Sequence, residues 1–126
     1  MRYLLDSNIL IGFLNDDKKI INWILERKRE DKLSLNISFI SKIEVLGFKE
    51  LKDDQVDELE KFLNTFYMLY LSDEIINLSA ALRRKVSLPL GDAVVAASAI
   101  SNKLILVTND KVLIKKVKNF VEVFSI

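Results

Sequence analysis

The sequence contains neither cysteine nor histidine among its 126 residues. Without cysteine, the chain has no disulfide framework and no thiolate metal site. Without histidine, it has no Ser-His-Asp or Cys-His nucleophile system, and it lacks the commonest general acid and base near neutral pH. An enzyme of this composition must work through carboxylates, lysines or hydroxyls. A metal held by carboxylates without imidazole would be a hard cation such as Mg²⁺ or Mn²⁺.

Long apolar runs are also missing, since none is long enough to span a membrane. The first residues do not have the pattern of a secretory signal, because Asp6 interrupts the apolar stretch and no small-residue cleavage site follows. We therefore expect a cytoplasmic protein with no membrane partner. Half of the residues are hydrophobic and 29% are charged, which predicts one globular domain over residues 1–126.

The formal net charge of +1 conceals an uneven distribution. Residues 1–80 carry 11 basic and 15 acidic side chains, whereas residues 81–126 carry 8 basic and 3 acidic ones. The basic residues gather in "LRRKV" (82–86) and "DKVLIKKVK" (110–118). Such clusters form either a solvated helix face or an edge that binds phosphates. The candidates for contacts to a nucleic-acid backbone are Arg83, Arg84, Lys85, Lys111, Lys115 and Lys116.

The apolar pattern alternates between strand and helix along the whole chain. Short apolar or alternating runs predict strands at residues 3–5, 32–39, 67–72, 104–107 and 121–126. Helical spacing predicts helices at residues 7–15, 16–30, 41–51, 53–66, 73–87, 89–103 and 111–119. Ser7 or Asn8 is the expected N-cap of the first helix, Ser72 caps another, and Pro89 opens the apolar one. This order predicts a three-layer α/β fold with a parallel sheet.

Four acidic residues lie among apolar or small residues near strand ends or helix starts: Asp6, Glu44, Asp92 and Asp110. Each has a structural explanation. Asp6 could bond the N–H groups of the next helix, and Ser41 with Glu44 matches a capping box. Asp92 could favour a helix start through the macrodipole, and Asp110 could cap a helix. For Glu44 alone, the capping box is the better interpretation.

Taken together, the four acids favour a different interpretation. Ligands of parallel α/β sheets bind beyond the carboxyl ends of the strands, where Asp6 and residues 108–110 are expected. Carboxylates gathered there would repel one another unless a cation neutralised them. The residues alone therefore indicate an α/β domain with a Mg²⁺ site suited to phosphoryl chemistry, next to a basic C-terminal third.

Four segments in order, "LLDSNILIGFL", "SKIEVLGF", "LPLGDAVVAASAI" and "LVTND", resemble the PIN domain over nearly the whole chain. More narrowly, they resemble the VapC-type toxin ribonucleases of toxin–antitoxin pairs. The resemblance implies a Rossmann-like sheet of five parallel strands and an endoribonuclease that depends on Mg²⁺ or Mn²⁺ and cleaves single-stranded or looped RNA.

The resemblance also implies roles for individual residues. Asp6 and Asp92 would be the principal metal ligands, with Glu44 and Asp110 completing the catalytic site. Thr108 and Asn109 would hold the carboxylates in place, whereas Asn8 is expected to cap a helix rather than touch substrate.

The family likeness further implies a homodimer and a small VapB-like antitoxin whose tail covers the site. Two sets of apolar residues could form a groove for such a tail: Trp23 with Ile20 and Ile24, or Phe13 with Phe48. Each of these residues singly is better explained as part of the core.

Two other functions remain open at the level of sequence. A non-catalytic PIN-like module could use the same fold to bind RNA or protein. An α/β phosphoacceptor signalling domain would need paired acids after its first strand, and "DSN" supplies only one. The sequence does not identify the RNA target, the number of metal ions, the antitoxin family, or whether such a nuclease is a toxin or a housekeeping enzyme.

Overall fold

Five parallel strands form one sheet in the computed structural model, which describes all residues from Met1 to Ile126. The strands are β1 (Tyr3–Leu5), β2 (Leu35–Ser38), β3 (Tyr67–Leu69), β4 (Ile105–Val107) and β5 (Val123–Phe124), in the order β3-β2-β1-β4-β5. The helices are α1 (Ser7–Leu14), α2 (Lys18–Glu30), α3 (Phe39–Leu46), α4 (Asp53–Leu63), α5 (Asp73–Val86), α6 (Leu90–Ser101) and α7 (Lys111–Val117). The predicted α/β architecture with a five-stranded parallel sheet is confirmed.

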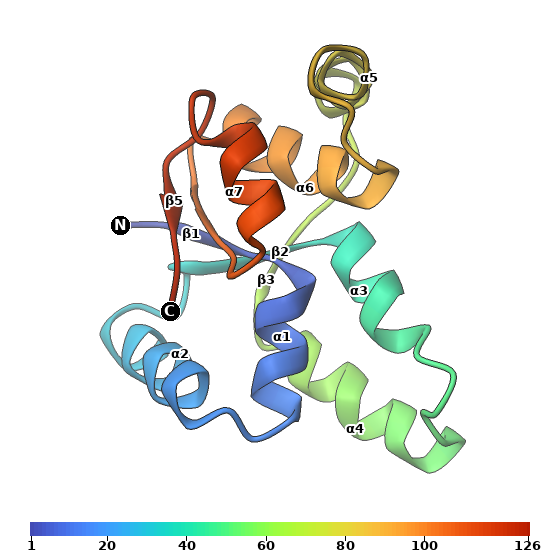
Figure 1. The fold of residues 1–126 in the computed structure, drawn as a ribbon. Coiled ribbons are helices and arrows are strands. Elements are labelled where there is room, and N and C mark those ends of the chain that lie inside the picture. Colours follow the sequence, from blue (N-terminus) through green and yellow to red (C-terminus); the bar gives the residue numbers. More distant parts are fainter.

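Helices cover both faces of this sheet, and each face has its own core (Figure 1). Neighbouring residues of one strand point to opposite faces, so Leu4 joins the core beneath α5, α6 and α7, and Leu5 joins the core of α1, α2 and α4. Helix α6 is buried from Ala93 to Ala99, as its lack of a polar face predicts. None of the helices has the length and apolar character that crossing a membrane requires.

The predicted start of α3 and the predicted N-cap of α1 are wrong. Helix α3 begins at Phe39, because the Ser38 side chain accepts a hydrogen bond from the Ile40 N–H and caps the helix there. Ser41 is consequently inside α3 and fully buried, and Glu44 lies near the end of α3 rather than in a capping box. Helix α1 is capped by Asp6, not by Ser7 or Asn8.

The order of the strands reverses direction between β1 and β4. From β1 the chain adds β2 and then β3 on one side, whereas β4 and β5 lie on the other side. Adjacent strands that leave in opposite directions form a topological switch point, where open α/β sheets bind their ligands. Asp6 directly follows β1, and Thr108 directly follows β4.

Candidate active site

Asp6 is a buried carboxylate at this switch point, with only 6% of its surface exposed. Its Oδ1 accepts a hydrogen bond from the Ser7 N–H at 2.8 Å, and its Oδ2 accepts one from the Thr108 hydroxyl at 2.8 Å. The pKa of Asp6 is raised from 3.8 to about 6, chiefly by burial and to a smaller extent by the negative charges of Asp92 and Glu44, while the two hydrogen bonds act to lower it. The fold therefore holds a carboxylate in a place that disfavours its charge.

Thr108 connects three of the residues that the sequence singles out. Besides donating to Asp6, its Oγ1 accepts from the Asp110 N–H at 3.1 Å and from Asn8 Nδ2 at 3.3 Å. Thr108 itself is fully buried. Asn8 thus lies in the first turn of α1 with its side chain directed to Thr108, and the prediction that it caps a helix is wrong.

Glu44 reaches the same region from α3. Its carboxylate lies against Gly91 in the first turn of α6, where a Cβ would be 3.0 Å from Glu44 Oε1. Partial burial raises the pKa of Glu44, and the charge of Asp92 adds to this increase. The Ser7 hydroxyl faces Glu44 and acts in the opposite direction, although it does not reach hydrogen-bonding geometry and remains unpartnered.

Asp92 and Asp110 complete the acidic group. Asp92 is half-buried in the first turn of α6, and its pKa is raised by burial and by the charge of Asp110, against the attraction of Lys116. Asp110 caps α7, which is the structural explanation considered for it from the sequence, because its Oδ1 accepts from the N–H groups of Val112 and Leu113 at 3.0 and 3.1 Å.

The four acids therefore influence one another, but as placed they do not form a closed cluster. No group of three or more acidic side chains is close enough to hold a metal ion. None of the four makes an ion pair, and Lys116 is the one cation that acts on the pKa of Asp6, Glu44 or Asp92. Two buried oxygen atoms beside the acids, Ser7 Oγ and Asn8 Oδ1, have no hydrogen-bond partner.

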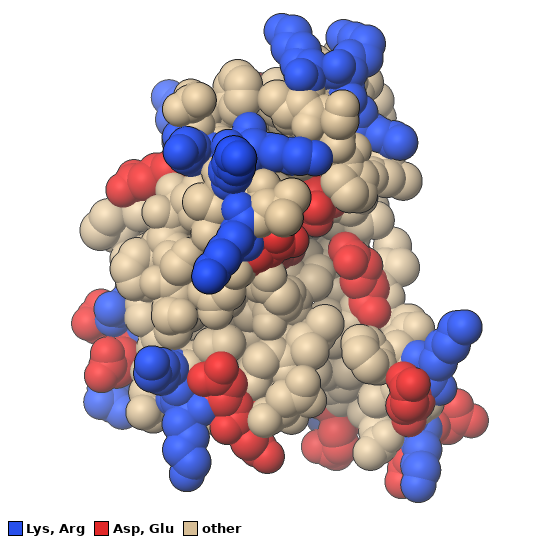
Figure 2. All heavy atoms as spheres, in the orientation of Figure 1, with Lys and Arg blue, Asp and Glu red and all other residues tan.

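Basic side chains border the acids on one side. Figure 2 shows acidic atoms near the centre of this face, with Lys and Arg side chains above them over α7 and at the top over α5. Arg83, Arg84 and Lys85 are in the last turn of α5, and Lys115 and Lys116 are in the last turn of α7. Lys116 is half-buried and donates to the Ser87 carbonyl at 3.2 Å, which joins the two basic clusters. The other five candidates, including Lys111 at the start of α7, are exposed.

The Asn109 side chain makes no direct contact with a carboxylate. Its Oδ1 accepts a hydrogen bond from the Ile126 N–H at 2.9 Å, so it contacts the segment after β5 rather than a carboxylate. Sequence analysis missed this segment, and also Ser7 and Gly91 as neighbours of Glu44. The positions of Ser7 and Gly91 in the sequence do not indicate that they contact Glu44, because only the packing of α3 against α1 and α6 brings the three residues together.

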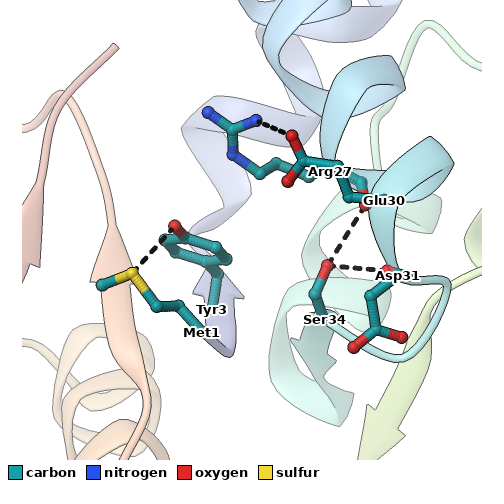
Figure 3. A pocket seen from close by; sticks show the side chains of 6 residues that line it. All are labelled: Met1, Tyr3, Arg27, Glu30, Asp31 and Ser34. Atoms are coloured by element: carbon teal, nitrogen blue, oxygen red, sulfur yellow. Dashed lines mark hydrogen bonds and ion pairs between the residues drawn. The ribbon is translucent and has the colours of Figure 1, made fainter.

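Two hollows of the surface lie away from the acids. A pocket of about 390 Å³ is lined by Met1, Tyr3, Arg27, Glu30, Asp31 and Ser34 (Figure 3). It lies at the amino-terminal ends of β1 and β2, the opposite edge of the sheet from Asp6. Its Arg27 pairs with Glu30 at 3.5 Å and stacks on Trp23.

A second hollow is an apolar groove of about 590 Å³ between α1, α3 and α4. Phe48, half exposed, lines it with Ile11, Leu14, Leu51, Leu59 and Phe62, and Glu50, Asp54 and Glu58 lie on its rim. Of the residues that sequence analysis considered for such a groove, Phe48 lines it, whereas Phe13 does not and stacks on Phe62. Ile20 and Ile24 are core residues, and Trp23 stacks on Phe124 and packs edge-on against Tyr3.

A family model supplies the observation that identifies this fold. The model for the PIN domain matches residues 3–119, nearly the whole chain and all four acids. The chain belongs to the PIN domain family. Membership supports a nuclease, a hydrolase that acts on nucleic acid. No functionally curated protein sequence matches this PIN domain.

Solved structures extend the comparison. This PIN domain is similar to a chain of a toxin–antitoxin complex from Klebsiella pneumoniae, with 28% identity, a TM-score of 0.77, and coverage of 97% of this chain and 95% of that one. It is also similar to a chain of VapBC2 from Rickettsia felis bound to a promoter DNA fragment, with 23% identity, a TM-score of 0.80, and coverage of 100% of this chain and 99% of that one. A chain of VapBC-1 from nontypeable Haemophilus influenzae has 21% identity, a TM-score of 0.80, and coverage of 99% of this chain and 98% of that one. The last two, at these identities, show the shared fold.

Proposed function

We propose that this PIN domain is a metal-dependent endoribonuclease, the toxin of a VapBC-type pair. The observation that carries the proposal is Asp6, a buried carboxylate at the switch point whose pKa is raised by its burial and by the charges of Glu44 and Asp92. Neighbouring carboxylates that disfavour one another's charge lower the stability of the fold. Such an arrangement is expected where a cation or a reacting group is bound.

The residues present fit a hard divalent cation. Every donor near Asp6 is an oxygen atom, and the buried Ser7 Oγ and Asn8 Oδ1 are unpartnered. Asp6 is held in place by Ser7 and Thr108, whereas no hydrogen bond fixes the side chains of Glu44 and Asp92. Asp6 and Asp92 would hold Mg²⁺ or Mn²⁺, and Glu44 and Asp110 would complete the site.

The chemistry proposed is hydrolysis of a phosphodiester bond. A bound Mg²⁺ would polarise the scissile phosphate and lower the pKa of a water molecule. Glu44 or Asp110 would orient the attacking water, whose oxygen bonds to phosphorus as the bond to the leaving ribose oxygen breaks. Thr108 fixes the direction of the Asp6 carboxylate through their 2.8 Å hydrogen bond, and so acts as a positioning residue.

RNA is the substrate we propose, bound through its phosphates. Arg83, Arg84 and Lys85 on α5 and the lysines of α7 would contact the RNA backbone on one side of the acids. The acids lie at the carboxyl-end edge of the sheet, so single-stranded or looped RNA, whose phosphates can reach a recessed metal ion, would suit the site better than a duplex.

The proposed partner is a small antitoxin, since several similar structures are toxin–antitoxin complexes. The apolar groove between α1, α3 and α4 is the candidate site for its tail. Because Glu50, Asp54 and Glu58 lie on the rim, the groove suits an amphipathic segment with basic residues. A homodimer is part of the same proposal and is tested by the mass of the pure protein in solution.

A second candidate is a non-catalytic PIN-like module that binds RNA or protein. The specific observation in its favour is that no three acidic side chains lie together as placed. This candidate predicts RNA binding through the basic residues of α5 and α7 without cleavage, in the presence or absence of a divalent metal ion.

Cleavage of single-stranded RNA by the pure protein tests the proposal. We expect cleavage with Mg²⁺ or Mn²⁺, none with EDTA, and losses of at least about 100-fold in Asp6→Asn and Asp92→Asn, because each removes a charged metal ligand. Asp57→Asn, an exposed position on α4, is the matched control and should cleave like the unchanged protein. Equal cleavage by all the variants, or cleavage that survives EDTA, would refute the nuclease proposal.

A further inference from the structure

The loop that carries Thr108, Asn109 and Asp110 is tied to residues 124–126. Three hydrogen bonds join them: the Thr108 N–H donates to the Phe124 carbonyl at 3.0 Å, the Ser125 hydroxyl donates to the Thr108 carbonyl at 2.9 Å, and the Ile126 N–H donates to Asn109 Oδ1 at 2.9 Å. Only the first of these continues the ladder between β4 and β5. The other two depend on the side chains of Ser125 and Asn109.

This segment, residues 124–126, is itself anchored. The Phe124 ring stacks on Trp23 of α2 with 5.6 Å between ring centroids, and Trp23 packs edge-on against Tyr3 of β1 at 5.0 Å. Ile126 packs on the core that includes Leu5 and Val107. A two-residue edge strand has little stability of its own, so these contacts are what hold the segment against the loop.

The loop in turn controls the acids. The Thr108 hydroxyl donates to Asp6 and accepts from the Asp110 N–H, so the main chain of residues 108–110 sets where Asp6 and Asp110 lie relative to each other. The Ser125 hydroxyl holds the Thr108 carbonyl, and the Ile126 N–H holds the Asn109 side chain. Residues 124–126 therefore act on the acids from outside the site.

We propose that Ser125 is a positioning residue of this site, acting with Asn109 to fix the loop at residues 108–110 and thereby the carboxylates of Asp6 and Asp110. Ser125 is far from the acids in the sequence and contacts none of them, and its one polar contact is the Thr108 carbonyl. The inference that this positioning serves catalysis rests on the proposed nuclease function. The effect of Ser125 on the loop at residues 108–110 can be measured whether or not the protein is a nuclease.

The first measurement is the kinetics of RNA cleavage by Ser125→Ala and Ser125→Thr. Loss of one hydrogen bond that positions the loop should lower kcat about two- to tenfold and weaken Mn²⁺ binding by a similar factor, with KM for RNA unchanged. Ser125→Thr keeps the hydroxyl and should restore both values. Equal kcat and Mn²⁺ affinity in Ser125→Ala and the unchanged protein would overturn the inference.

Ser72→Ala is the matched control. The Ser72 hydroxyl accepts from the Ile75 N–H at 3.2 Å and caps α5, so it also makes one hydrogen bond, but away from the acids. We expect Ser72→Ala to lower the melting temperature and leave kcat unchanged, whereas Ser125→Ala should lower kcat. A similar fall in kcat in both variants would mean that Ser125 acts only through stability.

The second measurement uses the metal-free protein and does not depend on activity. In Ser125→Ala the Asp110 amide, which donates to Thr108 Oγ1, should exchange with deuterium faster, while the Ile75 amide is unchanged. In Ser72→Ala the Ile75 amide should exchange faster and the Asp110 amide should be unchanged. If the unchanged protein does not cleave RNA, the nuclease proposal fails, and faster exchange at Asp110 would still support positioning by Ser125. Unchanged exchange at Asp110 would refute it.

Discussion

Asp6 combines two functions in one side chain, because it caps α1 and also supplies the most deeply buried charge of the acidic group. A cap usually accepts from the N2 or N3 amide, whereas Asp6 accepts from the adjacent Ser7 N–H and from Thr108. The second oxygen is thus directed across the switch point to β4. Helix capping and ligand binding, which are alternatives at the level of sequence, are compatible here.

The raised pKa of Asp6 predicts how stability depends on pH. In the folded state the Asp6 pKa is about 6, against 3.8 when exposed, so its contribution to stability is complete below pH 3.8 and is lost as pH rises through 6. The difference corresponds to about 3 kcal/mol of the free energy of unfolding. Asp6→Asn should therefore stabilise the metal-free protein at pH 7 by about 1–3 kcal/mol, with a smaller gain at pH 4.

Urea unfolding in EDTA between pH 4 and 8 measures this effect, with Asp57→Asn as the control for loss of an exposed charge. A gain in Asp6→Asn that is the same at every pH, or a loss at pH 7, would contradict the prediction. Added Mn²⁺ should stabilise the unchanged protein more than Asp6→Asn, because a ligand that binds the folded state shifts the unfolding equilibrium.

Helices α3 and α6 meet at the element scale through one glycine. Gly91 has no Cβ, and this lets the Glu44 carboxylate of α3 lie against the first turn of α6 beside Asp92. Capping of α3 by Ser38 rather than by Ser41 matters for the same contact. It places Glu44 in the last turn of α3, where no N-terminal amide is available to it, and so removes the capping explanation for its presence.

Gly91→Ala should separate activity from stability. The added Cβ would be 3.0 Å from Glu44 Oε1 and would move that carboxylate, whereas alanine favours the helix by up to about 1 kcal/mol relative to glycine. We expect RNA cleavage to fall about two- to tenfold while the melting temperature is unchanged or higher.

A double-mutant cycle with Glu44→Ala checks the cause. In the Glu44→Ala background, Gly91→Ala should have no further effect on kcat, because the side chain that it displaces is gone. Additive losses would show instead that the added methyl group acts on another part of the site.

The whole molecule separates its charges between two surfaces. The basic residues of α5 and α7 border the acids (Figure 2), and the groove between α1, α3 and α4 has an acidic rim. This division follows the chain, since residues 81–126 carry most of the excess positive charge and residues 1–80 the excess negative charge. Under the proposed function, RNA and a basic antitoxin segment would approach different surfaces of the protein.

Substitution of Lys111 and Lys115 by glutamine tests the RNA surface. The two residues are four apart on α7 and share a face, so together they could contact neighbouring phosphates. In EDTA, the double variant should bind single-stranded RNA more weakly at every sequence, and the slope of log K against log salt should fall by about 1.4. Lys18→Gln with Lys19→Gln on α2 is the control, and an equal loss there would refute the assignment.

The sequence by itself determined the class of fold and limited the side chains that are available for chemistry. Alternating strands and helices predict a parallel sheet, the apolar stretch after Asp92 predicts the buried helix α6, and the lack of histidine and cysteine leaves oxygen ligands only. These properties depend on local periodicity and side-chain type, and both can be read directly from the chain. Asp110 as a cap and Ser72 as a cap also follow from local pattern.

Only the tertiary structure decided which residues meet. The hydrogen bond of Thr108 to Asp6 spans 102 residues, the contact of Glu44 with Gly91 depends on how α3 packs on α6, and the bond between Asn109 and Ile126 depends on β5. The start of α3 was mispredicted because Ser38 and Ser41 are both competent caps, and burial of β2 selects the first. Contacts between distant segments are set by packing of the whole sheet, which no local pattern encodes.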